Sequence, residues 1–304
     1  MQILIVGAGY MGRALGQAWS QPQSGDPMGD PTSVHSGDNA GDDTTQTHHL
    51  TMIDPFYDNI SATPNAISPN AATPNVSTID FFKNLADVPP NYRPDMIVLA
   101  VKPQIMADVL PAYMVAFGNV DCLWVSIAAG LTVSFFESFG AGLPLPLTVI
   151  RCMPNMPLVY NAGAIGLFSK QQNAVRPIID PLFKKVGQVV WLSDEVQMNA
   201  VTAISGSGPA YIYLMIEALT KAGVKQGLLE SQAAILARQT VIGVGEVLKN
   251  APDVDCQTLR RQVTSAKGTT EAALDVLLDG DAFSQLIDQA VDAPYQRAIV
   301  LGQV

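Results

Sequence analysis

The sequence is short of basic residues and of long apolar runs, and each shortage excludes a class of protein. Of its 304 residues, 17 are Lys or Arg and 27 are Asp or Glu, which leaves a formal net charge of -10. A nucleic-acid partner would require a basic face, so we expect none. No apolar run approaches the roughly 20 residues that cross a bilayer, and no leader precedes the first apolar run, so we expect a cytoplasmic protein without a membrane partner.

Cysteine and histidine are scarce as well. Cys122, Cys152 and Cys256 stand far apart and form neither a CxxC pair nor a disulfide framework, which fits a reducing compartment. All three histidines fall inside or at the edge of one polar tract. The adjacent pair His48 and His49 is a candidate for a metal, but no cluster of further ligands surrounds it. We therefore expect no metal site and a folded body without histidine.

Two low-complexity insertions interrupt the first half of the chain. Residues 21–47 are rich in Gly, Pro, Asp, Ser and Thr and contain no Lys or Arg, and residues 61–78 repeat Pro-Asn pairs. Such compositions cannot bury enough apolar surface to build a core, so both are expected to be surface loops. A helical pattern is expected to begin at residues 79–82.

The strongest local signal is an apolar run, residues 3–6, followed directly by a GxGxxG pattern, which is typical of a dinucleotide site. The first glycine makes the tight turn out of the strand, the second lets the backbone approach a pyrophosphate, and the third lets the next helix pack on the sheet. The start of that helix offers free N–H groups to an anion. The predicted cofactor-binding residues here are Gly7, Ala8, Gly9, Tyr10, Met11 and Gly12.

Short apolar runs alternate with helical stretches as far as about residue 193, which predicts an α/β fold with a doubly wound, Rossmann-type sheet. The helical stretches beyond that point carry no strand signal. We therefore expect a dinucleotide-binding domain over residues 1–193, including both insertions, and an all-α domain over residues 194–304. Further strands are expected at residues 50–54, 96–101, 123–127, 147–152, 164–168 and 188–192.

One helix of the second domain, residues 210–219, is apolar nearly all round. Such a helix has to be covered on every side. Its own domain can supply the cover, but a second subunit is the simpler source, so we expect a homodimer, with assembly into larger homo-oligomers left open. Ser231 is expected to cap one helix, and Gly280 with Asp281 to end one helix and start the last.

Ligands of an open α/β sheet lie beyond the carboxyl ends of its strands, so the residues at those ends are candidates for the site. Asp54 ends the second strand, where an acid binds the ribose 2′-hydroxyl and repels a 2′-phosphate. This position predicts NAD(P)H as the cofactor, with NADH favoured over NADPH. A turn-forming Asp before Pro55 is the alternative.

A later strand ends in Ala100, Val101, Lys102 and Pro103. Lys102 is a candidate to hold cofactor phosphate or ribose, and a solvated lysine is the alternative. Pro103 is suited to open a helix. Asn155, in a proline-set turn after another strand, is a candidate to bond a nicotinamide carboxamide, although an Asn in a turn needs no such reason.

The helical domain contains two further segments of interest. In residues 205–211 glycines break one helix and Pro209 starts the next. Residues 263–271 form a loop of hydroxyl and small side chains that opens another helix. Free N–H groups at such a helix start can receive a carboxylate, and a plain helix cap is the alternative.

Together these segments resemble the pyrroline-5-carboxylate reductase family, nearly end to end outside the insertions. The resemblance rests on GAGYMG at 7–12, AVKPQ at 100–104, VSIAAG at 125–130, RCMPNMP at 151–157, SGSGPAY at 205–211 and VTSAKGTTEAAL at 263–274. It implies a Rossmann domain followed by a helical dimerisation domain. The active site would then lie between the cofactor and the hydroxyl-rich loop, which the partner subunit would contribute.

The resemblance also implies a reaction: hydride passes from the reduced nicotinamide to the C=N carbon of Δ1-pyrroline-5-carboxylate and yields L-proline. Thr270 would be the catalytic residue, bonding the ring nitrogen, and Ser265, Gly268 and Thr269 would hold the substrate carboxylate together with Thr270. The family loop reads SPGGTT. Here Ala266 replaces a proline and Lys267 a glycine, which is costly if φ is positive at 267.

Two alternatives stay open at this stage. A reductase of another cyclic imine or of a 3-hydroxy acid would share the fold, and hydroxy-acid chemistry would need a His or Lys acid, a role open to Lys267. A nucleotide-responsive binding protein without turnover would bind cofactor and oxidise none of it.

Overall fold

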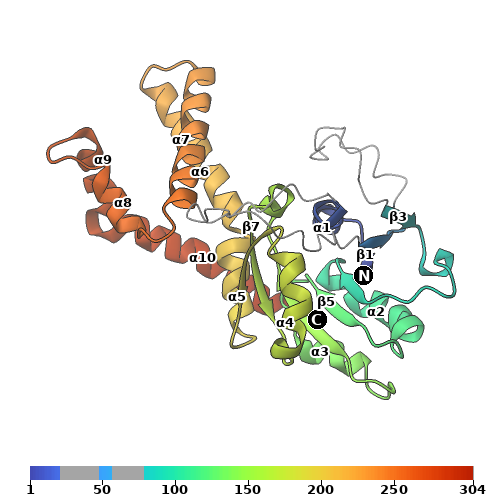
Figure 1. Cartoon of the computed structure of the whole chain (residues 1–304). Helices are drawn as coiled ribbons and strands as arrows, with labels where there is room; N and C mark the ends of the chain where they lie inside the picture. Colours follow the sequence, from blue (N-terminus) through green and yellow to red (C-terminus); the bar gives the residue numbers. More distant parts are fainter. Residues whose placement is uncertain (21–47, 57–78, 304) are drawn as a thin grey trace, which may run out of the picture. The chain divides into compact units, whose positions relative to one another are not determined.

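The computed structural model describes residues 1–20, 48–56 and 79–303. The chain divides into two compact units, Met1–Gly206 with Arg297–Val304 and Ser207–Gln296 (Figure 1). Both expected insertions lie outside the described residues. The domain division expected after residue 193 precedes the border between these units, and it stays a prediction.

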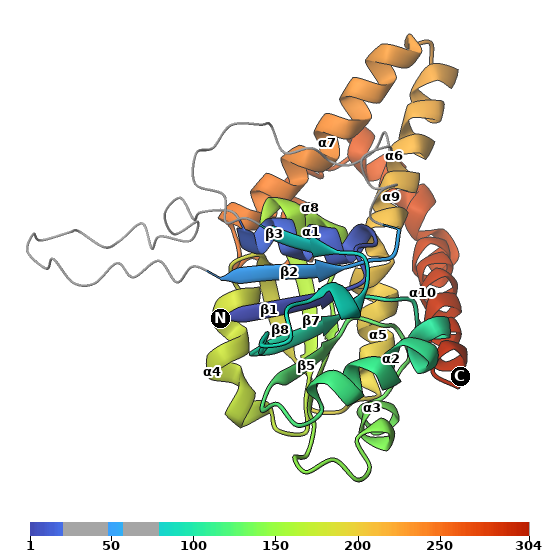
Figure 2. The same cartoon turned by 90° about the vertical axis from the view of Figure 1, so that its right-hand side faces the viewer.

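The first unit is built on an eight-stranded sheet in the order β3-β2-β1-β4-β5-β6-β7-β8. Neighbouring strands are parallel except β6 and β7, and Figure 2 shows β1 next to β2. The predicted doubly wound α/β fold is confirmed. The strands are β1 (Gln2–Val6), β2 (His49–Ile53), β3 (Ile79–Phe82), β4 (Met96–Leu99), β5 (Leu123–Ser126), β6 (Thr148–Met153), β7 (Gly163–Phe168) and β8 (Gly187–Trp191).

Helices cover both faces of this sheet. In β1, Ile3 and Ile5 pack with residues of α1 and α4 on one face, whereas Leu4 and Val6 pack with residues of α2 and α3 on the other. A strand buried on both sides reads as a continuous apolar run, which is why β1 was predictable. The helices of this unit are α1 (Tyr10–Ser20), η2 (Leu85–Asp87), α2 (Pro103–Phe117), α3 (Val133–Phe139), η3 (Met156–Tyr160), α4 (Gln172–Phe183), α5 (Gln197–Val201) and the π-helical turn η4 (Thr202–Gly206).

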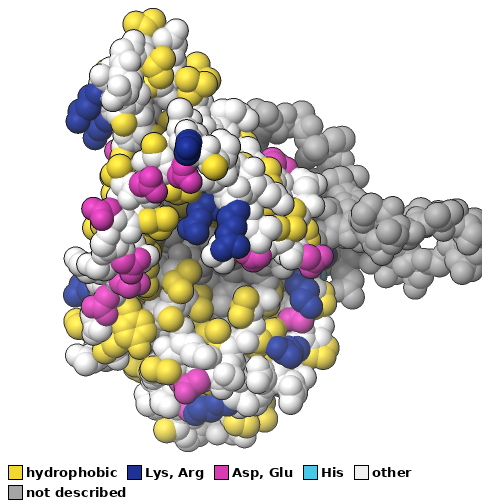
Figure 3. All heavy atoms as spheres, turned by 90° about the vertical axis from the view of Figure 1, so that its left-hand side faces the viewer, with side chains coloured by type: hydrophobic (Ala, Val, Ile, Leu, Met, Phe, Trp, Pro, Cys, Tyr) yellow, Lys and Arg dark blue, Asp and Glu magenta, His cyan; other side chains and the backbone are white. Residues whose placement is uncertain are grey.

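The second unit is helical. Figure 1 shows α6 and α7 as a hairpin, and none of the residues of α6 is buried within the chain. Its exposed apolar side chains include Ile212, Tyr213 and Leu214, and exposed hydrophobic side chains are visible on the face in Figure 3. Within the described residues, α7 therefore covers α6 only in part. The helices are α6 (Gly208–Lys225), α7 (Glu230–Asn250), α8 (Cys256–Gln262), α9 (Thr269–Leu278), η5 (Asp279–Asp281) and α10 (Ala282–Leu301), which continues into the first unit.

Two local predictions about helix ends have different outcomes. Gly280 adopts φ 55 between α9 and α10, so the expected break there is confirmed. The expected cap at Ser231 is wrong, because Ser231 lies inside α7 and the residue before the helix is Leu229. The N–H of Leu229 donates to Oε1 of Gln232 at 3.1 Å, so the first turn of α7 bonds back to the residue before the helix.

The prediction of a helical pattern from residue 79 is also wrong. Ile79–Phe82 is β3, an edge strand that pairs in parallel with β2, Leu50 opposite Ile79. A run of four residues is too short for its periodicity to separate helix from strand, and pairing with the exposed edge of β2 decides the outcome.

The expectation of a folded body without histidine is corrected as well. His49 is the first residue of β2, and His48 before it is 8% exposed. Burial, then the charges of the N-terminal ammonium and Lys185, lower the pKa of His48, so the imidazole is neutral at pH 7. Residue His35 lies outside the described part of the chain.

Two absences apply to the described residues. No group of three or more His, Cys, Asp or Glu side chains there is placed to hold a metal ion. None of the helices in that part of the chain combines the length and apolar character that crossing a membrane requires.

Candidate active site

The carboxyl ends of four neighbouring strands form one edge of the sheet. Val6 of β1 pairs with Leu99 of β4, Leu99 with Ser126 of β5, and Ser126 with Arg151 of β6. The segments that follow these strands therefore emerge side by side. This edge brings together three of the predicted groups: the glycine loop at 7–12, the segment at 100–103, and the turn that contains Asn155.

Backbone packing explains two of the three loop glycines. Gly7 has φ +95, and a Cβ there would lie 2.9 Å from the carbonyl oxygen of Ala100. A Cβ on Gly12 would lie 2.2 Å from the carbonyl oxygen of Gly7. Any side chain at either position would push α1 away from the strands, so both glycines permit the close approach that the sequence predicted.

Gly9 is different, because a Cβ built on it would meet nothing within 4 Å. The space beside Gly9 is therefore open. The first intrahelical bond of α1 runs from the N–H of Arg13 to the carbonyl of Gly9 at 3.0 Å. The N–H groups of Tyr10, Met11 and Gly12 precede it and are left for an anion.

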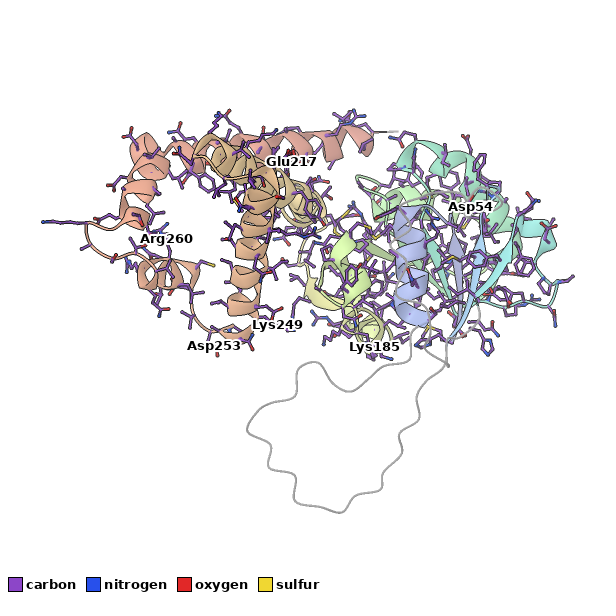
Figure 4. The ribbon with its side chains drawn as sticks, turned by 90° about the horizontal axis from the view of Figure 1, so that it is seen from above. Asp54, Lys185, Glu217, Lys249, Asp253 and Arg260 are labelled. Atoms are coloured by element: carbon purple, nitrogen blue, oxygen red, sulfur yellow. The ribbon has the colours of Figure 1, made fainter. Side chains whose placement is uncertain are left out.

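Asp54 (Figure 4) follows β2 and reaches back to the glycine loop. Its Oδ2 accepts the N–H of Ala8 at 2.6 Å, and its Oδ1 accepts the N–H of Phe56 at 2.8 Å. The carboxylate therefore lies beside the glycine loop, as a ribose-binding acid must. It also closes the turn at Pro55, which is the structural role given above as the alternative.

Lys102 is the exposed residue before α2, and Pro103 occupies the first turn, which confirms the expected helix start. The N–H of Ala100 donates to the carbonyl of Val6 at 2.8 Å, so this segment is tied to β1. Burial, followed by the charge of Asp54, raises the pKa of Tyr113 in α2 to about 12. Tyr113 is thus a neutral phenol at pH 7.

Asn155 is 7% exposed, and both ends of its side chain have partners. Nδ2 donates to the carbonyl of Ser205 at 3.0 Å, and Oδ1 accepts the N–H of Ala164 at 2.8 Å. An amide has a second N–H and a second lone pair, so a bond to a carboxamide would use the remaining capacity. Its first role in the described structure is to tie β7 and the π-helical turn η4 to the end of β6.

An ion pair that carried no signal in the sequence lies next to this edge. The guanidinium of Arg151, with a side chain 5% exposed, lies 3.2 Å from Oε1 of Glu195. The same oxygen accepts the N–H of Val133, the first residue of α3, at 2.6 Å. Burial lowers the pKa of Arg151 and the charge of Glu195 opposes that shift. The carboxylate thus joins β6 to the start of α3.

The predicted substrate residues form a separate cluster in the second unit. The N–H of Gly268 donates to the carbonyl of Ser265 at 3.0 Å, which closes a turn directly before α9. Thr269 and Thr270 are the first two residues of α9, and no side chain caps this helix start. A Cβ on Gly268 would lie 2.4 Å from Oγ of Ser265, so a glycine is required for this turn.

Lys267 adopts φ 59, the left-handed conformation in which a residue other than glycine is strained. The expected cost at this position is therefore present. The N–H of Lys267 donates to Oε2 of Glu271 at 2.5 Å, and this bond holds the strained residue against the first turn of α9.

Lys267→Gly is expected to raise the free energy of unfolding by about 0.5–1 kcal/mol. Relief of a left-handed strain of about 1–2 kcal/mol exceeds the extra unfolded-chain entropy of glycine, about 0.4–1 kcal/mol. Urea unfolding at one fixed protomer concentration measures the change. Lys221→Gly inside α6 is the matched control and should cost about 1 kcal/mol. Equal destabilisation by both variants would contradict the assignment of strain to Lys267.

Histidine is absent from this edge among the described residues. In the register of β1 and β2, Gln2 pairs with His49, which places His48 and His49 at the amino ends of the strands. The carboxyl edge of the first unit therefore offers backbone N–H groups and Lys102 rather than an imidazole acid.

Comparison with known proteins agrees with these features. A family model described as pyrroline-5-carboxylate reductase dimerisation matches residues 195–301. A pyrroline-5-carboxylate reductase of Haemophilus influenzae is 41% identical over 209 residues, 68% of this chain and 75% of the relative. One of Pseudomonas aeruginosa is 41% identical over 211 residues, 69% of this chain and 75% of the relative.

Solved structures give the same result. The pyrroline-5-carboxylate reductase of Coxiella burnetii superposes with a TM-score of 0.75 at 27% identity, covering 99% of this chain and 98% of that one. The fold is shared with a pyrroline carboxylate reductase of Plasmodium falciparum, solved with NADP bound, at a TM-score of 0.71 and 24% identity over 99% and 98% of the two chains. The chain belongs to the pyrroline-5-carboxylate reductase family.

Proposed function

We propose that this chain is an NAD(P)H-dependent oxidoreductase that reduces the C=N bond of Δ1-pyrroline-5-carboxylate to L-proline, the final step of proline biosynthesis. Relatives at 41% identity that carry this name are the observation on which the proposal chiefly rests. The glycine loop beside Asp54 and the uncapped start of α9 supply the two kinds of site that the reaction needs.

The residues at the carboxyl edge fit a dinucleotide. Gly9 leaves open space for a pyrophosphate, and the N–H groups at the start of α1 would bind it. Asp54 would bind the ribose, Ala100, Val101, Lys102 and Pro103 would line the cofactor, and Asn155 would bond the carboxamide. When bound, the reduced nicotinamide supplies the hydride, the step that no side chain can perform.

The loop before α9 fits a small carboxylate. The N–H groups of Thr269 and Thr270 at the start of α9 would hold it at the positive end of the helix dipole, with Ser265 and Gly268 forming the turn beside them. The hydroxyl of Thr270 would bond the ring nitrogen, orient the imine and assist its protonation. Because the product is an amine, no strong acid has to quench an alkoxide, which agrees with an edge that lacks histidine among the described residues.

Positioning two planar rings against each other would then be the main contribution of the protein to the rate, worth several kcal/mol of the activation barrier.

Oxidation of NADH and of NADPH, followed by absorbance with Δ1-pyrroline-5-carboxylate present and absent, tests the function. Substrate-dependent oxidation with formation of L-proline is expected. Nucleotide binding without oxidation would identify a binding protein instead, and turnover of a 3-hydroxy acid with loss in Lys267→Met would identify the other reductase.

Asp54→Asn is expected to raise the ratio of kcat/KM for NADPH to kcat/KM for NADH about tenfold. A carboxylate about 4 Å from a 2′-phosphate costs between about 1 and 4 kcal/mol, and 1.4 kcal/mol is tenfold. Asp95→Asn is the control, because Oδ2 of Asp95 accepts the N–H of Gln2 at 2.7 Å at the amino edge of the sheet. An unchanged ratio in Asp54→Asn would remove Asp54 from cofactor selection.

The exposed apolar face of α6 supports a homodimer as the active form. The small-molecule partner is the substrate of the proposed reaction. We propose that a second copy covers this face. Sedimentation velocity distinguishes a dimer from a larger assembly of dimers. Leu214→Glu, which places a charge on this face, is the variant that should shift the protein towards monomer.

A further inference from the structure

The loop that joins β5 to α3, residues 127–132, lies at the same carboxyl edge as the proposed cofactor site. Two hydrogen bonds hold its first residues, one to the neighbouring strand β4 and one to Ser126 at the end of β5. The N–H of Ile127 donates to the carbonyl of Leu99 at 3.2 Å, and the N–H of Ala128 to Oγ of Ser126 at 3.2 Å. Both bonds lie at the start of the loop, and Leu131 beyond its middle is fully buried in the core.

The middle of the loop lies against the end of α10. Gly130, in the middle of the loop, has φ +83, and a Cβ there would lie 2.5 Å from the carbonyl oxygen of Ala298 and 2.6 Å from the nitrogen of Gly302. In return, a Cβ on Gly302 would lie 2.4 Å from the carbonyl oxygen of Gly130. The two backbones therefore touch directly, and each needs the other to be glycine.

This contact is buried and belongs to a firm helix end. Ala298 is 1% exposed, and the N–H of Gly302 donates to the carbonyls of Ala298 and Ile299 at 3.2 and 3.1 Å. The last turn of α10 is thus closed at the residue that meets the loop. A backbone contact without side chains transmits a shift directly, since no rotamer can absorb it.

We propose that Gly302 and the last turn of α10 are positioning elements of the dinucleotide site. They fix the β5–α3 loop in the position in which it contacts the nicotinamide ring. The inference rests on the proposed function for the identity of the ligand. Since β5 lies between β4 and β6 in the sheet, its loop emerges between residues 100–103 and Asn155, the proposed partner of the carboxamide. Residues far from the glycine loop therefore govern the nicotinamide end of the cofactor and leave the adenosine end unaffected.

Gly302→Ala tests this assignment, with two nucleotides as probes. NADPH contains the nicotinamide, whereas ADP-ribose 2′-phosphate lacks it and occupies only the remainder of the site. The added Cβ forces the backbone of residue 130 to move, so we expect the Kd of NADPH to rise about tenfold, kcat to fall about tenfold, and the Kd of ADP-ribose 2′-phosphate to change less than twofold.

Two further variants keep the outcome decisive. Gly142→Ala is the matched control. Gly142 lies in an exposed loop of the same unit with φ +90, and a Cβ built on it meets nothing within 4 Å. This variant therefore strains the backbone without pushing against another segment. Ala298→Gly loosens the same contact without inserting an atom, and it serves if Gly302→Ala fails to fold. It should raise the Kd of NADPH about threefold and spare the shorter nucleotide.

Equal loss of both nucleotides, or loss of neither in Gly302→Ala and Ala298→Gly, would overturn the proposal, as would the same selective loss in Gly142→Ala. These binding measurements do not depend on turnover. A wild-type protein that binds NADPH but reduces no Δ1-pyrroline-5-carboxylate would therefore refute the proposed function while the role of Gly302 is still decided.

Discussion

Replacing Thr270 by valine is expected to lower kcat about 100-fold with the fold unchanged. Valine keeps the shape of threonine but has no hydroxyl, so the imine nitrogen would lose the group that we propose orients and helps to protonate it. A positioned proton donor contributes about 100- to 10,000-fold, and the lower end applies because water can protonate the imine before it binds. Steady-state oxidation of NADPH measures the change.

Two other variants define what this loss means. Thr270→Ser keeps the hydroxyl and should retain kcat within about tenfold. Thr240→Val is the matched control, since the hydroxyl of Thr240 donates to the carbonyl of Leu236 within α7 at 2.8 Å and has no part in the proposed site. If Thr270→Val kept the wild-type kcat, the hydroxyl would not act on the imine and Thr270 would be only the second residue of a helix.

Replacing Glu195 by alanine is expected to lower the free energy of unfolding by about 3–5 kcal/mol. The change leaves the guanidinium of Arg151 buried without its carboxylate, which is the costly way to break a buried ion pair. It also removes the acceptor of the N–H of Val133 at the start of α3. Urea unfolding at a fixed protomer concentration gives the difference.

The exposed pair of Lys170 and Glu137 is the matched control, with Nζ and Oε2 2.5 Å apart and side chains 46% and 35% exposed. Glu137→Ala should cost no more than about 1 kcal/mol, because water screens an exposed pair. The double variant R151M/E195M should be more stable than Glu195→Ala, since no buried charge is left alone. A loss in Glu195→Ala no larger than in Glu137→Ala would contradict the burial argument.

Much of the fold was predictable from the sequence, for identifiable reasons. The strands β1 and β4 are buried on both faces and read as unbroken apolar runs, and Gly7 and Gly12 mark a turn whose backbone distances leave no room for a Cβ. The edge strand β3 was not predictable, because four residues carry too little periodicity. Likewise, Ser231 is a residue type that commonly caps helices, and its identity alone does not show that α7 already begins at Glu230.

The candidate site divides in the same way. Glycines, Asp54 and the loop before α9 carry local signals, since turns and helix starts demand particular residue types. The partners of Arg151 and Gly130 carry no local signal. Glu195 is 44 residues from Arg151, and Gly302 is farther still from Gly130 along the chain. Contacts between distant segments depend on the tertiary fold, and only the three-dimensional structure reveals them.

In the proposed reaction hydride passes from the nicotinamide to the imine carbon, and the fate of a deuterium label on the cofactor shows whether it does. The protein is incubated with Δ1-pyrroline-5-carboxylate and NADPH or NADH deuterated at C4, and the product is analysed by mass spectrometry. The expected product is L-proline with one deuterium on the ring carbon that was doubly bonded to nitrogen. Proline without deuterium from cofactor labelled on either face, or no proline at all, would contradict the proposed reaction.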